Sequence, residues 1–183
     1  MSLIYGEKFG KLYLKKELNL SLSRNEVLLI KGNNGVGKTT LVKLLIKYIK
    51  NDFGFLNNNT KKVYYLEENV SLPEWITACE YISIIEKIKK QKISYILDEL
   101  FDIPKNVKIR HLSKGNKQKL ALLTVLVNGA DLYILDEPSS GLDKGTLNEF
   151  VMFLKDYFIK GQTLVIISHD NSYDEISSRT MFI

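Results

Sequence analysis

Cysteine and long apolar runs are scarce in this sequence of 183 residues. The single cysteine, Cys79, excludes an internal disulfide, and with two histidines in the chain there is no Cys/His cluster to hold zinc. The longest apolar stretches, residues 120–127 and 164–167, are far shorter than the roughly 18–20 residues of a membrane-spanning helix. The first residues, MSLIYGEK, lack the apolar core of a secretory signal. The sequence therefore predicts neither a secreted nor a membrane-spanning protein.

Arginine is scarce as well. The formal net charge is +5, from 26 basic and 21 acidic residues, and a basic balance is one property of nucleic-acid-binding proteins. Only Arg24, Arg110 and Arg179 carry the guanidinium group that binds phosphate and guanine in a bidentate way. The other basic residues are lysines scattered along the chain. We therefore expect no nucleic-acid partner and interpret the positive charge as a solvated surface that favours solubility; if this surface has a partner, an acidic membrane surface fits it better.

The hydrophobic pattern predicts one α/β domain. Short apolar or alternating runs predict strands at 12–22, 27–31, 62–66, 131–135 and 163–168. Apolar residues at helical spacing predict helices at 39–50, 74–90, 94–101, 116–128 and 146–159. The first strand is expected at an antiparallel edge, and the buried strands in a mostly parallel sheet that helices cover on both faces. The middle of the chain is expected to be a helical insert.

The segment GNNGVGKTT, residues 32–40, fits the pattern G-x-x-x-x-G-K-[ST] between an expected strand and an expected helix. In such a loop, backbone N–H groups and the positive end of the helix face phosphates. We expect Lys38 to neutralise the β- and γ-phosphates and Thr39 to give a hydroxyl to Mg²⁺. The predicted nucleotide-binding residues of the loop are Gly32, Asn33, Asn34, Gly35, Val36, Gly37, Lys38, Thr39 and Thr40. The pattern indicates that the chain binds a nucleoside triphosphate.

Two adjacent acids, Asp136 and Glu137, follow an apolar run in the segment LYILDEP. Acids at the carboxyl end of a buried parallel strand lie where α/β sheets bind ligands. We predict that Asp136 holds Mg²⁺ through its water. We also predict that Glu137 orients and partly deprotonates the attacking water.

A third motif, residues 112–119 with the sequence LSKGNKQK, opens a predicted helix. Ser113 is a candidate N-cap, and Gly115 leaves the approach to the helix bare. A second helix N-terminus of this kind predicts a second anion site, although residues 32–40 already bind one set of phosphates. Two such sites on one chain make sense if one of them serves a neighbouring molecule.

Taken together, these motifs resemble the nucleotide-binding subunit of ATP-binding cassette (ABC) transporters, with LSxG ahead of LDEPSSGLD and ISHD. The resemblance covers the chain from about residue 3 to residue 183, and the spacings agree: 75 residues from Lys38 to Ser113, 23 more to Asp136 and 33 more to His169. It implies a P-loop NTPase core at about 1–67 and 116–183, and a helical subdomain at about 68–115.

The resemblance also implies individual roles. Phe9 matches the aromatic residue that stacks on adenine, with Tyr5 and Tyr13 as nearby alternatives. Ser113 and Gly115 match the residues that contact the γ-phosphate held by a partner subunit. In the same way, Asp143 matches the loop that crosses the dimer interface, and His169 matches the histidine that touches the γ-phosphate.

Two positions depart from the family pattern. Asn116 replaces the glutamine that usually follows the signature glycine, and it keeps the amide. The pair Glu67 and Glu68 replaces the glutamine expected after the strand at 62–66, and Glu68 is the better match in register. A carboxylate can also bind Mg²⁺. The predicted metal ligands are therefore Thr39, Glu68 and Asp136.

The resemblance implies an ATPase that hydrolyses ATP to ADP and phosphate. Two copies would close head to tail around two ATP molecules, and a separate membrane-spanning permease would convert this motion into transport. The expected location is the cytoplasmic face of the cell membrane.

Three rival classes of protein are weighed against this interpretation. A ribosome or translation factor usually carries two cassettes, and an SMC-type repair ATPase needs a coiled coil for which the 45 residues from Glu68 to Ser113 leave no room. In a regulator without turnover, Glu137 would be unnecessary.

Overall fold

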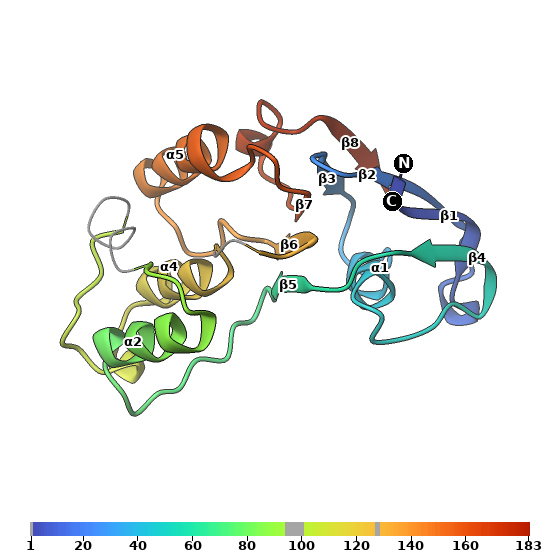
Figure 1. The fold of residues 1–183 in the computed structure, drawn as a ribbon. Coiled ribbons are helices and arrows are strands. Elements are labelled where there is room, and N and C mark those ends of the chain that lie inside the picture. The colour runs from blue at the N-terminus through green and yellow to red at the C-terminus, as the bar shows by residue number, and fades with distance from the viewer. Residues whose placement is uncertain (1, 94–100, 127–128) are drawn as a thin grey trace.

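Five short strands form a parallel sheet at the centre of the molecule (Figure 1). The computed structural model describes residues 2–93, 101–126 and 129–183. In spatial order the strands are β5 (Val63–Leu66), β6 (Leu132–Asp136), β7 (Leu164–Ile167), β3 (Val27–Lys31) and β8 (Arg179–Phe182). All four pairings are parallel. The structure therefore confirms the α/β class, and the predicted strands at 27–31, 62–66, 131–135 and 163–168 to within one residue at each end.

A second sheet of three antiparallel strands lies beside the first, at the right of Figure 1. Its strands are β1 (Ser2–Gly10), β2 (Leu18–Ser23) and β4 (Phe53–Asn58), in the order β2-β1-β4. The predicted strand at 12–22 is wrong in its first half. Residues Leu12–Leu14 form a 3-10 turn, and Lys15 has a left-handed backbone with φ of 51° that ends it before β2 begins.

The helices are α1 (Lys38–Leu45), α2 (Ala78–Lys89), α4 (Lys114–Val125) and α5 (Lys144–Phe153), which continues as a π-helical turn at Leu154–Phe158. The prediction placed the end of α1 too late, at residue 50. Lys47 has a φ of 61°, and Asn58 Nδ2 donates a hydrogen bond to the carbonyl oxygen of Leu45 at 2.7 Å. In the described ranges, no helix combines the length and apolarity that crossing a bilayer requires.

The prediction also placed the start of α2 too early, at residue 74. Thr77 is the N-cap, and Thr77 and Glu80 form a reciprocal capping box. The preceding residues 74–76 form a turn and a bend instead of a helix, and the carbonyl oxygens of Glu74 and Ile76 accept hydrogen bonds from the backbone N–H groups of Arg110 and Ile109. Residues 94–100 of the predicted helix at 94–101 lie outside the described residues. The division into a core and a subdomain at 68–115 stays a prediction.

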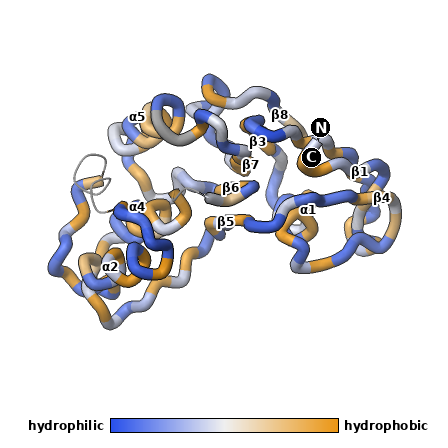
Figure 2. Tube along the Cα trace, in the orientation of Figure 1, coloured by the Kyte–Doolittle hydropathy of each residue, from blue (hydrophilic) through white to orange (hydrophobic). Residues whose placement is uncertain are grey.

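Apolar side chains pack on both faces of the parallel sheet, and Figure 2 shows hydrophobic residues along β5 and β6. Because side chains alternate along a strand, Leu29 and Leu135 join the cluster formed with α2, α4 and α5. Leu28 and Ile134 join the opposite cluster, formed with α1 and the antiparallel sheet. The sheet is thus covered on both faces, and its carboxyl edge remains available for a site.

Candidate functional site

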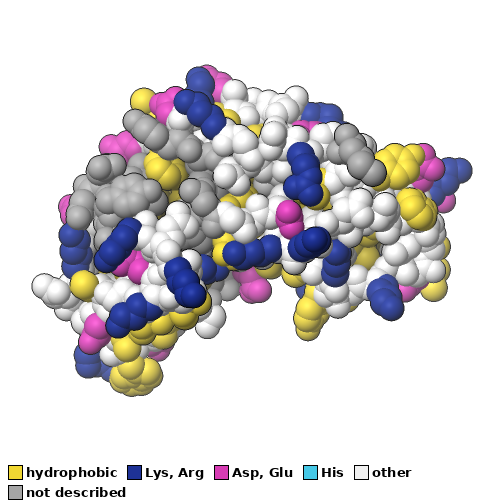
Figure 3. All heavy atoms as spheres, in the orientation of Figure 1, with side chains coloured by type: hydrophobic (Ala, Val, Ile, Leu, Met, Phe, Trp, Pro, Cys, Tyr) yellow, Lys and Arg dark blue, Asp and Glu magenta, His cyan; other side chains and the backbone are white. Residues whose placement is uncertain are grey.

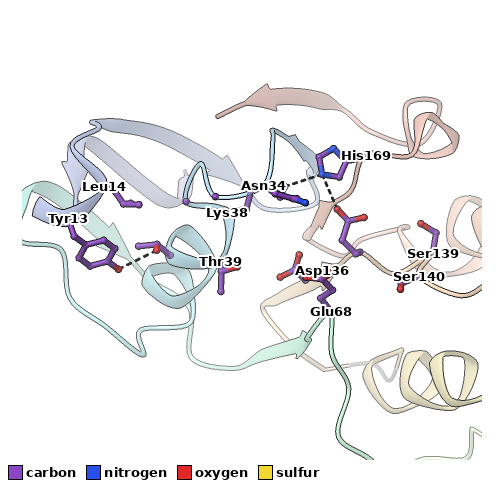
Figure 4. A pocket seen from close by; sticks show the side chains of 14 residues that line it. Tyr13, Leu14, Asn34, Lys38, Thr39, Glu68, Asp136, Ser139, Ser140 and His169 are labelled. Carbon is purple, nitrogen blue, oxygen red and sulfur yellow. Dashed lines mark hydrogen bonds and ion pairs between the residues drawn. The ribbon is translucent and has the colours of Figure 1, made fainter. Parts of the chain in front are cut away.

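The carboxyl ends of four parallel strands meet at one cavity (Figure 4). β3 leads into the loop 32–37 and β5 leads to Glu68, while β6 ends at Asp136 and β7 precedes His169. The cavity has a volume of about 790 Å³. The residues that line it are Tyr13, Leu14, Asn34, Gly35, Gly37, Lys38, Thr39, Thr40, Glu68, Asp136, Glu137, Ser139, Ser140 and His169. This edge of a parallel sheet is where open α/β folds bind ligands.

Two glycines shape the loop before α1. Gly35 and Gly37 have φ values of 82° and 109°, which residues with a side chain rarely adopt. A Cβ on Gly37 would also lie 3.1 Å from the side chain of Leu14. The helix begins immediately afterwards, and its first three residues line the cavity. The unpaired N–H groups of the first turn of α1 and the positive end of its dipole therefore lie at this cavity.

The ammonium group of Lys38 joins this loop to the end of β7. Its Nζ donates hydrogen bonds to the carbonyl oxygens of Gly32 at 2.6 Å and Asn33 at 3.3 Å. It also lies 3.1 Å from Nε2 of His169, as Figure 4 shows. A fixed cation beside a helix N-terminus forms a site for an anion such as phosphate.

Not all the predicted loop residues line the cavity. Six do, from Asn34 to Thr40 without Val36. Gly32, Asn33 and Val36 belong to the same loop but do not line it. Gly32 has a packing role instead, because a Cβ there would lie 2.5 Å from the carbonyl oxygen of Ile183.

Asp136 is 5% exposed at the end of β6. Burial raises the pKa of its carboxyl group to about 6, and the charges of Glu68 and Glu137 act in the same direction. The hydroxyl of Tyr65 donates a hydrogen bond to Oδ2 of Asp136 at 3.3 Å, and this bond and the charge of Lys38 favour the ionised form. Such a carboxylate is stabilised by any further cation that enters the cavity.

Glu137 has a strained backbone, with φ of 45° in the left-handed region. Its N–H donates a hydrogen bond to the carbonyl oxygen of Ile167 at 2.8 Å, so β7 holds it in place. The hydroxyl of Ser168 donates to Oε2 of Glu137 at 3.3 Å. Nε2 of His169 lies 3.6 Å from Oε1. Strain of this kind is typical of active sites, and here it directs a carboxylate toward the cavity.

Thr39, Glu68 and Asp136, the predicted metal ligands, all line the cavity. One hydroxyl and two carboxylates suit Mg²⁺, which keeps several waters and usually takes one or two protein carboxylates together with phosphate oxygens. Across the described residues, no cluster of three or more His, Cys, Asp or Glu side chains could hold a metal ion. The donor set therefore fits Mg²⁺ that is shared with a phosphate group.

The structure contradicts the adenine-stacking role of Phe9. Its side chain is 0% exposed and packs in the core between the sheets, and a Cβ on Gly6 would lie 2.6 Å from its ring. Tyr13 is 63% exposed and lines the cavity, with its hydroxyl 3.3 Å from Oγ1 of Thr40 (Figure 4). Tyr5 does not line the cavity. Tyr13 is therefore the aromatic residue that the structure places at the site.

The signature residues do not line the cavity. Ser113 is the N-cap of α4, as predicted, and its hydroxyl accepts a hydrogen bond from the N–H of Asn116 at 3.2 Å. Asp143 is the N-cap of α5, where its two carboxylate oxygens accept hydrogen bonds from the N–H and the hydroxyl of Thr146. These bonds hold the pKa of Asp143 below its usual range.

The start of α4 packs against the loop that leaves β6. A Cβ on Gly115 would lie 2.6 Å from the carbonyl oxygen of Gly141, so only glycine permits this approach. The buried side chain of Gln118 donates a hydrogen bond to the carbonyl oxygen of Pro138 at 3.2 Å. The signature helix is thus in contact with the segment that carries Glu137.

Sequence reasoning missed some contributors to the cavity. Ser139 and Ser140 line it, and their position directly after the two acids was a usable signal. Leu14 also lines it, from a turn where a strand was predicted. The contact between Tyr65 and Asp136 depends on the pairing of β5 with β6, which the sequence pattern alone does not reveal.

A glycine-rich loop between β3 and α1, with a lysine, a threonine and acids at the end of a neighbouring strand, defines a P-loop nucleotide-binding fold. A protein-family model described as ABC transporter matches residues 15–140, more than half of the chain. The protein belongs to the ABC transporter family.

Known relatives agree with this assignment. The ATP-binding protein Uup of Caulobacter vibrioides is 30% identical over 186 residues, which cover 96% of this chain and 30% of that protein. The chain thus spans about 30% of the length of that relative. The ATP-binding protein LolD of the lipoprotein-releasing system of Bacteroides fragilis is 30% identical over 203 residues, which cover 96% of this chain and 93% of LolD.

Solved structures show the same fold. A dimeric structure of the ATP-binding cassette MJ0796, in a post-hydrolysis state with ADP and Pi, matches with a TM-score of 0.82 at 20% identity, over 98% of this chain and 94% of that one. The archaeal ribosome recycling factor aABCE1, in complex with the ribosomal stalk protein aP1, matches with a TM-score of 0.82 at 26% identity. That match covers 100% of this chain and 37% of the other.

Proposed function

We propose that the chain is the ATP-binding and ATP-hydrolysing subunit of an ABC transporter. One observation carries the proposal: a lysine at a helix N-terminus, two acids and a histidine, from three different strand ends, line the same cavity. Phosphoryl transfer needs groups that position the phosphates, neutralise their charge and orient the attacking water. The cavity holds a candidate for each of these tasks.

The nucleotide is placed by the loop and by Tyr13. The N–H groups of the loop and the ammonium group of Lys38 bind the phosphates. Tyr13, in place of Phe9, stacks on the adenine from the open side of the cavity. Thr39, Asp136 and Glu68 would hold Mg²⁺ directly or through water, and the bound ion would neutralise phosphate charge. Glu68 thereby takes the position of the family's glutamine.

In hydrolysis, a water oxygen attacks the γ-phosphorus and the bond to the bridging oxygen of ADP breaks. Glu137 accepts a hydrogen bond from this water and directs its lone pair toward phosphorus, and the water's proton leaves to Glu137 or to the phosphate. Lys38 and His169 stabilise the charge on the γ-phosphate oxygens. The strained backbone of Glu137 and its bond from Ser168 fix the carboxylate for this task.

We further propose that Ser113, Gly115 and Asp143 complete the site of a second copy. None of them lines the cavity of its own chain, which supports a role for a neighbouring molecule. Two copies would then close head to tail around two ATP molecules. The contact between Gly115 and Gly141 joins the signature helix to the loop after Glu137, so closure and the catalytic acid are mechanically linked.

The proposed partner is a membrane-spanning permease, with the chain at the cytoplasmic face of the cell membrane. LolD, the ATP-binding protein of a lipoprotein-releasing system, is matched over 93% of its length, and this likeness supports a transport role. Figure 3 shows hydrophobic side chains gathered over α2 at the lower left, where Ile84 and Ile88 are 44% and 68% exposed. An exposed apolar surface favours a protein partner. On the face that Figure 3 shows, the Lys and Arg side chains are spread over several elements.

A ribosome factor is the second candidate, because aABCE1 matches at 26% identity. Fractionation of cells that express the tagged full chain separates the two. Recovery with membranes, lost after treatment that strips peripheral proteins, supports the transporter. Co-sedimentation with ribosomes would favour the second candidate. A gene for a polytopic membrane protein next to the gene for this chain would support the transporter independently.

The catalytic part of the proposal is tested with Glu137→Gln. This change keeps the size and a hydrogen bond but removes the base, so we expect ATP to bind without turnover and an ATP-dependent homodimer to accumulate in size-exclusion chromatography. Adding Ser113→Arg should return the protein to a monomer, because a bulky side chain blocks the approach to the partner's phosphates.

Matched controls use the same changes elsewhere. Glu149→Gln replaces an exposed acid on α5, and Ser83→Arg adds the same bulk to an exposed position on α2. Neither lies at the cavity, so both should leave turnover unchanged. Turnover at the wild-type rate by Glu137→Gln would refute the assigned mechanism.

A further inference from the structure

The register of two strands places Tyr65 beside Asp136. In the pairing of β5 with β6, Tyr65 lies opposite Ile134. Because alternate residues of a strand point to the same face, Tyr65 and Asp136 are diagonal neighbours on one face of the sheet. The hydroxyl of Tyr65 spans this diagonal and donates a hydrogen bond to Oδ2 of Asp136 at 3.3 Å.

This hydrogen bond restrains rotation of the Asp136 carboxylate. With one oxygen held by the hydroxyl, the other oxygen keeps a set direction at the cavity. Asp136 also faces the like charges of Glu68 and Glu137, which would push a loosely held carboxylate away from them. Hydrogen-bonded partners of metal-binding carboxylates commonly set the orientation on which metal affinity depends.

We propose that Tyr65 is a positioning residue that orients Asp136 for Mg²⁺. The inference rests on the proposed function and adds to it a residue outside the sequence motifs. Tyr65 does not line the cavity, so it acts through Asp136 and not on the nucleotide. Its ring is fixed by packing among the apolar side chains on the α1 side of the sheet.

The adjacent residue provides a matched control. Tyr64 lies opposite Tyr133 in the same pairing and therefore points to the other face. Its ring packs against that of Tyr133 with centroids 5.7 Å apart and lies under the ammonium group of Lys89. Tyr64→Phe and Tyr65→Phe each remove one hydroxyl from neighbouring positions, but only the second one removes a bond to Asp136.

The test compares nucleotide binding with and without metal. A fluorescent ATP analogue is titrated in EDTA and then at increasing Mg²⁺ concentration. For Tyr65→Phe we expect the Mg²⁺ concentration at half-maximal effect to rise about tenfold, the lower end of the range for such partners because the bond is long. Nucleotide affinity in EDTA should stay at the wild-type value. Tyr64→Phe should match the wild type in both conditions.

A double-mutant cycle identifies the route of the effect. Asp136→Asn removes the charge that the hydroxyl orients, so adding Tyr65→Phe to it should give no further shift in the Mg²⁺ requirement. Thermal unfolding of each variant shows that it is folded at the assay temperature. If Tyr65→Phe does not fold, Tyr65→Leu tests the same metal-specific loss with another apolar side chain.

The outcomes are distinct. An unchanged Mg²⁺ requirement in Tyr65→Phe overturns the inference, as does an equal loss of affinity in EDTA, because a purely structural hydroxyl would give the latter. Either result leaves the proposed ATPase intact. A wild-type protein whose nucleotide affinity does not respond to Mg²⁺ overturns the metal site itself, and the inference with it.

Discussion

Replacement of Phe9 and of Tyr13 should separate a core residue from a binding residue. Phe9 is 0% exposed in the core between the two sheets, whereas Tyr13 is 63% exposed at the edge of the cavity. We expect Phe9 substitutions to lower the free energy of unfolding with no direct effect on nucleotide binding. Tyr13 substitutions should do the reverse.

The magnitudes follow from burial. Truncating a buried Phe to Ala costs about 3–5 kcal/mol, a large part of the about 5–15 kcal/mol that stabilises a typical domain. Phe9→Leu is the gentler change, because it keeps most of the volume. At Tyr13, an exposed substitution changes stability by no more than about 0.5 kcal/mol. Loss of aromatic stacking, about 0.5–1.5 kcal/mol, raises the dissociation constant about twofold to tenfold.

Two measurements on each variant decide the matter: urea-induced unfolding and titration with a fluorescent ATP analogue. Phe9→Leu should be less stable but bind with wild-type affinity, and Tyr13→Phe should be unchanged in both because the ring remains. Tyr13→Ala should bind more weakly at normal stability. A Phe9→Leu protein of normal stability with weakened nucleotide binding would show that our assignment of the two aromatic residues is reversed.

Three further predictions concern other parts of the chain. Lys38→Ala should weaken ATP binding about tenfold or more, because a full charge beside the phosphates is lost; equal affinity in the same titration would remove Lys38 from its role. Gly115→Ala should slow turnover and lower the free energy of unfolding by about 1–3 kcal/mol, because the new Cβ would lie 2.6 Å from the carbonyl oxygen of Gly141. Turnover at the wild-type rate would show that this contact does not affect catalysis. The N–H groups of residues 61–62, and then Arg24, hold the pKa of Asp131 below its usual range. Its stabilising effect is therefore complete above about pH 4 and fades as the pH falls through the lowered pKa. Asp131→Asn should reduce stability at pH 7 and differ less from the wild type near pH 3, and a difference that grows on acidification would contradict this.

The central sheet and its cavity were predictable because their signals are local. Short apolar runs identified β3, β6 and β7, and the motif residues follow directly at the ends of these strands. A strand that is buried on both faces needs an unbroken apolar run, and few other structures produce one. Because the strands are parallel, their carboxyl ends lie at the same edge of the sheet, and Asp136 and His169 can therefore be placed at that edge from the sequence.

An antiparallel β element near the start of the chain was predicted and is confirmed, but its strands β1 and β4 were missed, because β1 is irregular. The pairing of β1 with β2 shifts register between Gly6 and Phe9, and Lys8 has a φ of 46°. A bulge of this kind breaks the alternation of side chains on which a sequence reading depends. Phe9 lies at this irregularity with its side chain buried in the core, and the sequence pattern did not reveal that burial.

Helix ends were missed for a different reason. The start of α2 carries a clear local signal, the pair Thr77 and Glu80 three residues apart. The residues before it form a turn that is hydrogen-bonded to residues 109–110, and Thr77 pairs with Lys108, so the partner segment is distant in the sequence. The helix boundaries therefore depend on contacts between distant segments, and the hydrophobic periodicity of residues 74–90 does not predict them.

The position of β3 has a consequence for how the chain acquires its fold. The strand that leads into the phosphate loop pairs on one side with β7 and on the other with β8, the last two strands of the sequence. Pairings between distant segments form slowly, because a long stretch of chain must be closed first. During synthesis, the first third of the protein therefore contains the loop but lacks both neighbours of its strand. A nascent chain should gain affinity for nucleotide only when residues 164–182 have left the ribosome, and ATP added earlier should give it no protection from proteolysis.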